Sequence, residues 1–180
     1  MTQVPQVVIW LVSAVLVEAA VIDGLKLKVP NWLTFHMIAG GQAYAAWCGG
    51  AQGLLWSLEG AALGLALLLP LYAIGGMGAG DVKLLAGIGA WVGPWLTLQA
   101  FAATAVVGGV MAVAMVAWSG AYFRHLAMFQ TIGSEILAVR NPAKLSEIAA
   151  GRKPTMMLLP YGIPMAVGTI AFFLWAGLLF

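Results

Sequence analysis

Two acidic residues stand out in a chain that is otherwise strongly apolar. Asp23 ends the first apolar stretch, and Asp81 closes the string Gly78-Ala79-Gly80-Asp81. A carboxylate at the edge of a bilayer is costly, so such acids mark a functional site by default. Two carboxylates held close together cannot both ionise easily, so one keeps a proton while the other is charged. A pair of this kind can activate a water molecule and protonate a leaving amine, which is the chemistry of an aspartic protease.

The glycines before Asp81 fit the same interpretation. A glycine lets two backbones approach closely and lets the chain turn into a helix through conformations that other residues avoid. A plainer interpretation is also open, in which Asp81 only caps a helix and Asp23 only ends one. Both interpretations place Asp81 at the start of a helix.

Composition assigns the chain to the integral membrane proteins. Of its 180 residues, 63% are hydrophobic and 8% are charged, which is far from the average soluble domain. A membrane-spanning helix needs roughly 20 residues, so there is room for about six. We expect residues 1–180 to form a single membrane-embedded domain. The net charge of +2 comes without a basic run or a stacking platform, which excludes a nucleic-acid-binding protein.

Six apolar stretches are separated by glycines, prolines and the few charged residues. They cover residues 6–22, 33–48, 54–74, 82–93, 95–118 and 157–179. The basic residues follow the first stretch, follow the third, or lie between the fifth and the sixth. If every stretch crosses the membrane, these three places share one side, which the positive-inside rule makes cytoplasmic. We therefore predict an all-α integral membrane protein with about six transmembrane helices, both termini outside, and an interfacial or cytoplasmic helical loop at 119–153.

This topology brings both acids to the cytoplasmic side, and it helps to interpret the other polar residues. Glu18 lies a little over one helical turn before Asp23, where we favour a buried structural partner over a catalytic role. Lys83 could favour the ionised form of Asp81 or could serve only to set the topology. Glu59 precedes Gly60 and Gly64, whose GxxxG spacing predicts close contact between helices.

No metal site is expected from the sequence. The single cysteine, Cys48, cannot form an internal disulfide or a cysteine-rich zinc site. His36 and His125 have no neighbours at ligand spacing. We expect no cofactor.

Three ordered motifs resemble the type IV prepilin peptidase family, the GxGD membrane aspartyl proteases. The motifs are Asp23 to Trp32 (DGLKLKVPNW), Gly78 to Leu84 (GAGDVKL) and Pro160 to Pro164 (PYGIP). The short TadV- and CpaA-like members of the Flp/Tad type are the most similar. The resemblance implies that Asp23 and Asp81 are the catalytic pair. It implies a further set of residues that shape the site or bind substrate, namely Gly78, Gly80, Lys83, Pro30 and Asn31.

The resemblance also implies the substrate and the setting. Members of the family remove the basic leader peptide of prepilins or pseudopilins at the cytoplasmic face, without a metal. The partners expected here are such a substrate, with its leader and apolar helix, and membrane lipid, in the inner membrane of a bacterium. Bifunctional members carry an extra segment with paired Cys-x-x-Cys motifs. This chain has only Cys48, so we expect no methyltransferase activity.

Two alternatives remain on sequence alone. Intramembrane aspartyl proteases of the presenilin or signal-peptide-peptidase kind share GxGD, but they have a tyrosine before the first acid, where this chain has Ile22. The other alternative is a small transporter or proton-coupled membrane subunit. In that protein Glu18, Asp23 and Asp81 would line an ion path.

Overall fold

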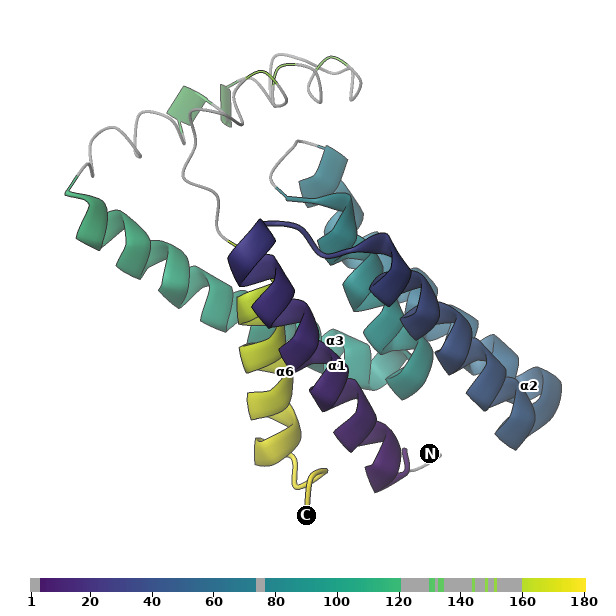
Figure 1. The fold of residues 1–180 in the computed structure, drawn as a ribbon. Coiled ribbons are helices and arrows are strands. Elements are labelled where there is room, and N and C mark those ends of the chain that lie inside the picture. Colours follow the sequence, from purple (N-terminus) through teal and green to yellow (C-terminus); the bar gives the residue numbers. More distant parts are fainter. Residues whose placement is uncertain are drawn as a thin grey trace.

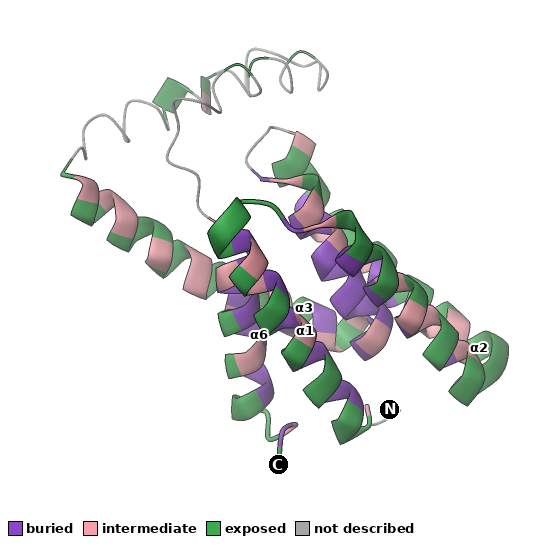
Figure 2. Ribbon diagram, viewed as in Figure 1, coloured by how far each residue is buried: buried purple, intermediate pink, exposed green. Residues whose placement is uncertain are grey.

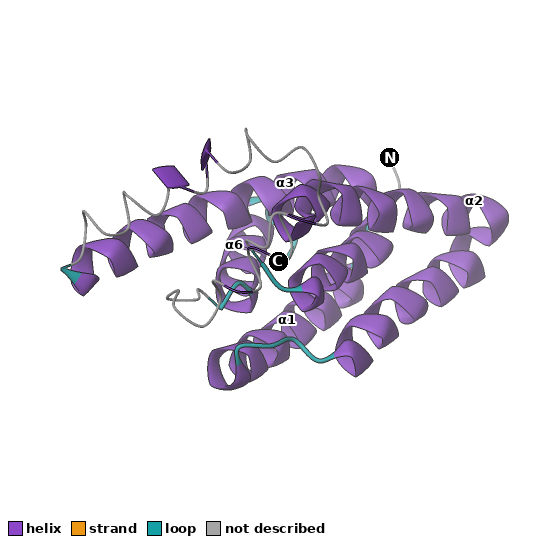
Figure 3. Ribbon diagram, turned by 90° about the horizontal axis from the view of Figure 1, so that it is seen from above, coloured by secondary structure: helices purple, strands orange, loops and turns teal. Residues whose placement is uncertain are grey.

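The computed structural model is built of α-helices (Figure 1). It describes residues 4–73, 77–120 and 160–180, and also residues 130, 131, 133, 134, 144, 148 and 151. The helices are α1 (Gln6–Lys26), α2 (Asn31–Ala73), α3 (Ala79–Ser119) and α6 (Gly162–Trp175). These described ranges contain no strand, which confirms the predicted all-α fold (Figure 3). Apart from its first residues and the isolated positions, the predicted loop at 119–153 lies outside the described residues.

The long helix α2 folds back on itself at Gly50. This glycine has φ 58° and ψ −141°, a conformation that residues with a side chain avoid. A Cβ atom at Gly53 would overlap the carbonyl oxygen of Ala45, so the two parts of α2 touch just beyond the bend. The reversal is visible from above (Figure 3). It agrees with the predicted break between the apolar stretches 33–48 and 54–74.

A second interruption divides α3 at Gly93, which has φ 75° and ψ 176°. Pro94 follows, and a proline lacks the N–H that the preceding turn of a helix would use. The ring of Trp56 occupies the space where a side chain at Gly93 would lie. The predicted break between the stretches 82–93 and 95–118 is therefore confirmed.

The part of α3 after Pro94 runs alongside α6 in the opposite direction. Gly168 lies against Thr104, whereas Gly108, further along α3, lies against Pro164, nearer the start of α6. At the other end of the bundle, the Gln6 side chain donates a hydrogen bond to the carbonyl oxygen of Leu179 at 2.8 Å. Both termini therefore lie at the same end (Figure 1).

The helices are those of a membrane protein. α1, α2 and α3 are each long and apolar enough to cross a bilayer, and α6 is a shorter apolar helix. Large apolar residues such as Trp10, Val106 and Val113 are exposed. The buried residues gather where the helices pack together (Figure 2). Because α2 and α3 are each interrupted, the described chain can run back and forth more often than its four helices suggest. The number of six crossings stays a prediction.

Small residues hold α2 against the first part of α3. A Cβ atom at Gly60 would overlap the carbonyl oxygen of Gly89, and one at Gly64 would lie 2.6 Å from the carbonyl oxygen of Leu85. The close helix contact predicted from the GxxxG spacing is confirmed. Ser57 Oγ donates to the carbonyl oxygen of Ala90 at 2.7 Å, which satisfies a hydroxyl that would otherwise be costly in this apolar interior. These contacts fix the start of α3, where Asp81 lies, relative to α2.

The packing of α3 on α6 predicts that cysteines introduced at positions 108 and 164 can form a disulfide. A Cβ atom at Gly108 would lie 3.6 Å from Cβ of Pro164, within the range that a disulfide needs. In a Cys48→Ala background, the double variant Gly108→Cys/Pro164→Cys is expected to oxidise readily. Mass spectrometry after tryptic digestion should then find the two cysteine-containing peptides joined. The matched control is Gly109→Cys/Pro164→Cys, because Gly109 faces open space. Equal oxidation of both pairs would contradict this packing.

Candidate active site

Asp23 lies in the last turn of α1 and is tied to the start of α6. Its carboxylate is buried, with the residue 3% exposed, and Oδ2 accepts a hydrogen bond from the backbone N–H of Gly162 at 2.7 Å. Its carbonyl oxygen accepts the N–H of Leu27, which has a left-handed conformation and ends the helix. Asp23 does more than end α1, because its side chain links the first helix to the last.

Asp81 lies in the first turn of α3 and is 7% exposed. Its Oδ2 accepts the backbone N–H of Gly78 at 3.1 Å. A negative charge at this position also interacts favourably with the positive end of the helix dipole. Asp81 therefore lies at the start of a helix, as both interpretations predicted, and its side chain binds the N-cap residue. The same bond holds the carboxylate in a fixed orientation.

The residues at the start of α6 interact with both acids. The pKa of the Tyr161 phenol is raised, mainly by burial and further by the negative charge of Asp81. Gly162, the next residue, donates its N–H to Asp23. Two adjacent residues thus interact with one acid each. Both predicted acids therefore lie at the start of α6, although they are far apart in the sequence.

No side chain fits at Gly162. A Cβ atom there would lie 2.9 Å from Cβ and 3.0 Å from Oδ2 of Asp23. Tyr161 and Gly162 belong to the third motif, PYGIP, but neither residue was predicted to be part of the site. The available signal was a tyrosine and a glycine between two prolines, directly before an apolar helix.

The residues predicted to shape the site lie at the same end of the bundle. The turn between α1 and α2 rests on α3, because a Cβ atom at Gly80 would be 2.7 Å from the carbonyl oxygen of Val29. Lys83 Nζ donates to Asn31 Oδ1 at 3.0 Å and lies 4.8 Å from the centre of the Phe35 ring. Pro30 immediately precedes α2, and Gly78 binds Asp81. Lys83 therefore fastens the start of α2 to α3.

Glu18 does not have the predicted environment. It is exposed on the outer surface of α1, so the expectation of a buried structural partner is wrong. The buried face of this helix contains Leu16, Ala19 and Asp23. Residue 18 lies outside that face because successive residues of a helix point in different directions.

Comparison with known proteins gives one match. Residues 10–113, more than half of the chain, match the type IV leader peptidase family. The matched region contains both aspartates, the turn between α1 and α2, and the interruption of α3. No match was found among the curated proteins or the solved structures.

The close contact at Gly162 leads to a stability prediction. Gly162→Ala is expected to lower the free energy of unfolding by about 1–3 kcal/mol, because the added methyl group overlaps Asp23. Thermal unfolding of the detergent-solubilised protein measures the change. Gly49→Ala is the control, since Gly49 lies in α2 and nothing lies within 4 Å of its Cβ position. An equal melting temperature for the wild type and both variants would mean that α6 does not lie this close to Asp23.

The electrostatic interaction between Asp81 and Tyr161 predicts that removing the charge of Asp81 changes the pKa of Tyr161. The charge of Asp81 disfavours the tyrosinate, so Asp81→Asn is expected to lower the pKa of Tyr161. Burial should still keep it above the ordinary value. The pKa is obtained by comparing tyrosinate absorbance during titration of each protein and its Tyr161→Phe counterpart. Glu59→Gln, at an exposed position on α2, should cause no shift. An unchanged pKa in Asp81→Asn would place the two side chains too far apart to interact.

Proposed function

The chain belongs to the type IV leader peptidase family, and from this premise we propose that it is an aspartyl endopeptidase acting on type IV prepilins or pseudopilins of the Flp type. Membership makes the chain a peptidase, and therefore a hydrolase. The observation that carries the aspartyl mechanism is the burial of Asp23 and Asp81 beside Gly162 and Tyr161.

In the proposed reaction the scissile peptide bond lies between the two carboxylates. The ionised aspartate takes a proton from water as the water oxygen bonds to the carbonyl carbon. The protonated aspartate gives its proton to the peptide nitrogen as the C–N bond breaks, which releases a new carboxyl group and a new amine. Each aspartate ends with the proton state that the other had before. The roles belong to the coupled pair and are not divided between Asp23 and Asp81.

Backbone hydrogen bonds support this chemistry by fixing both acids. One oxygen of each carboxylate is held by a main-chain N–H, from Gly162 for Asp23 and from Gly78 for Asp81. A preoriented pair loses less freedom on reaching the transition state than a mobile one does. The contact of Lys83 with Asn31 keeps α2 and α3 aligned around Asp81.

We propose that the acids face the cytoplasm, with both termini on the outer side of a bacterial inner membrane. Lys26 and Lys28 closely follow Asp23, and Lys83 closely follows Asp81 in the sequence. The termini lie at the other end of α1 and α6 (Figure 1). A prepilin exposes its basic leader on that side. We expect no methyl transfer to the new amino terminus.

The transporter alternative loses support from the position of Glu18. That reading requires Glu18, Asp23 and Asp81 to line one path, but Glu18 is exposed on the outer surface while both aspartates are buried. A peptidase needs only the two buried acids.

The two-acid mechanism is tested by co-expressing the protein with a candidate Flp-type prepilin. Asp23→Asn and Asp81→Asn are each expected to reduce cleavage about 10²–10⁴-fold, because each removes one partner in proton transfer. Precursor and product are separated by gel electrophoresis and quantified. Glu59→Gln, which neutralises an exposed acid on α2, should cleave like the wild type. Wild-type cleavage by either aspartate variant would disprove the proposed pair.

A further inference from the structure

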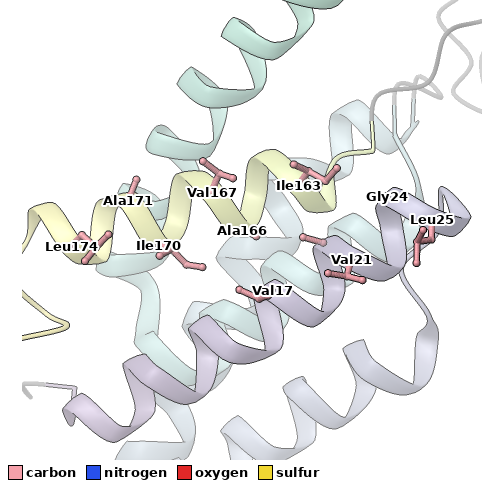
Figure 4. Close-up of a pocket in the computed structure, with 11 residues that line it drawn as sticks. Val17, Val21, Gly24, Leu25, Ile163, Ala166, Val167, Ile170, Ala171 and Leu174 are labelled. Atoms are coloured by element: carbon pink, nitrogen blue, oxygen red, sulfur yellow. The ribbon is translucent and has the colours of Figure 1, made fainter.

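An apolar groove runs along the outer surface between α1 and α6 (Figure 4). Its volume is about 730 Å³. The α1 side of the lining consists of Val17, Ala20, Val21, Gly24 and Leu25. The α6 side consists of Ile163, Ala166, Val167, Ile170, Ala171 and Leu174.

One end of the groove adjoins the candidate active site. Gly24 follows Asp23 in the chain, and Ile163 follows Gly162, the residue that binds Asp23. At this end the two helices are in contact, because a Cβ atom at Gly24 would lie 3.4 Å from Cδ1 of Ile163. From Ile163 to Leu174 the lining extends about 16 Å, or three helical turns. The groove thus leads from Asp23 along the apolar part of the bundle.

The walls of the groove are open to the surroundings of the protein. Val17 and Val167 are each 51% exposed, and Leu174 is 47% exposed. In a membrane protein these side chains face the bilayer. An occupant therefore has to be apolar and has to arrive within the plane of the membrane.

Glu18 favours a polypeptide occupant over a lipid chain. It follows the groove residue Val17 and is exposed. With the part of the chain that the structure describes, it forms no hydrogen bond or ion pair. An acid within a membrane-spanning helix is stabilised by a partner that donates a hydrogen bond or carries a positive charge. Hydrocarbon offers neither, whereas the first turn of a peptide helix has backbone N–H groups that no carbonyl within the helix accepts.

We propose that the groove between α1 and α6 binds the apolar helix of the substrate and holds the peptide bond before that helix at Asp23. This inference rests on the proposed peptidase function and adds the surface that selects the substrate. The leader lies on the side of the acids, so the bound helix starts at Ile163 and runs toward Leu174, parallel to α6. Two parallel helices rise equally per residue, so positions along the substrate stay in step with positions along α6.

Disulfide crosslinking tests both where the substrate helix binds and in which direction it runs. The peptidase carries Cys48→Ala, to remove its own cysteine, and Asp81→Asn, to keep the substrate intact. Val167→Cys or Leu174→Cys is added and paired with a Flp-type prepilin that has single cysteines placed along its apolar helix. We expect the strongest crosslink to move about seven residues toward the prepilin C-terminus when the peptidase cysteine moves from 167 to 174. Ala66→Cys, at an exposed position on α2, is the control and should give no crosslink.

The outcomes separate this inference from the proposed function. If the wild type cleaves the prepilin but cysteines at 167 and 174 give no crosslink, the proposal that the groove binds the substrate helix is wrong, and the proposed function still stands. Crosslinks that join two peptidase chains and exclude the prepilin also overturn it, and make a second copy the occupant. A shift in the opposite direction overturns the parallel arrangement. Failure of the wild type to cut the prepilin overturns the proposed function and, with it, this inference.

A kinetic measurement provides an independent check. Ala171→Leu narrows the groove at an exposed position, so KM for the membrane-embedded prepilin is expected to rise about tenfold while kcat stays the same. Cleavage of a soluble peptide that ends shortly after the scissile bond should not change. The matched substitution Ala66→Leu should leave both substrates unaffected. Equal effects of Ala171→Leu on the two substrates would overturn the proposal.

Discussion

The hydrogen bond from Gly162 N–H to Asp23 Oδ2 connects the two ends of the fold. It joins residues that are 139 positions apart and fixes the start of α6 against the end of α1. The same junction positions Tyr161 near Asp81, so the relation between the two acids depends on it. The groove between α1 and α6 also begins there, because Gly24 and Ile163 are the next residues on either side. The N–H of Gly162 thus helps to position both the candidate site and the groove that begins beside it.

Close backbone packing fixes the start of α3, where Asp81 lies. Gly60 and Gly89 allow α2 and α3 to touch through their main chains, and Gly80 does the same for Val29 and the first turn of α3. A main chain has no rotamers to adjust, so such contacts leave little freedom in the position of Asp81. The turns at Gly50 and Gly93 let two long apolar helices bend back into this arrangement.

Much of this arrangement could be predicted from the sequence, because glycines and prolines interrupt the apolar stretches at positions where the chain does change direction. The shared location of Asp23 and Asp81 followed from charge placement, whereas Lys83 and Asn31 were expected near the site from the family resemblance. The exposure of Glu18 could not be predicted, since both faces of α1 are apolar and polarity does not show which face is buried. The role of Gly162 was also hidden, because it depends on a backbone N–H meeting the carboxylate of a residue far away in the sequence rather than on a local pattern.

The link between the first and the last helix has a consequence for biosynthesis. Asp23 and Asp81 leave the ribosome before Gly162, which comes 81 residues after Asp81 (162 minus 81). At roughly 5–20 residues per second, the interval lasts on the order of 4–16 seconds. During that time the carboxylate of Asp23 has no Gly162 to orient it. A partly synthesised chain therefore holds both acids without the Gly162 donor, and the candidate site is complete only after the start of α6 has been made.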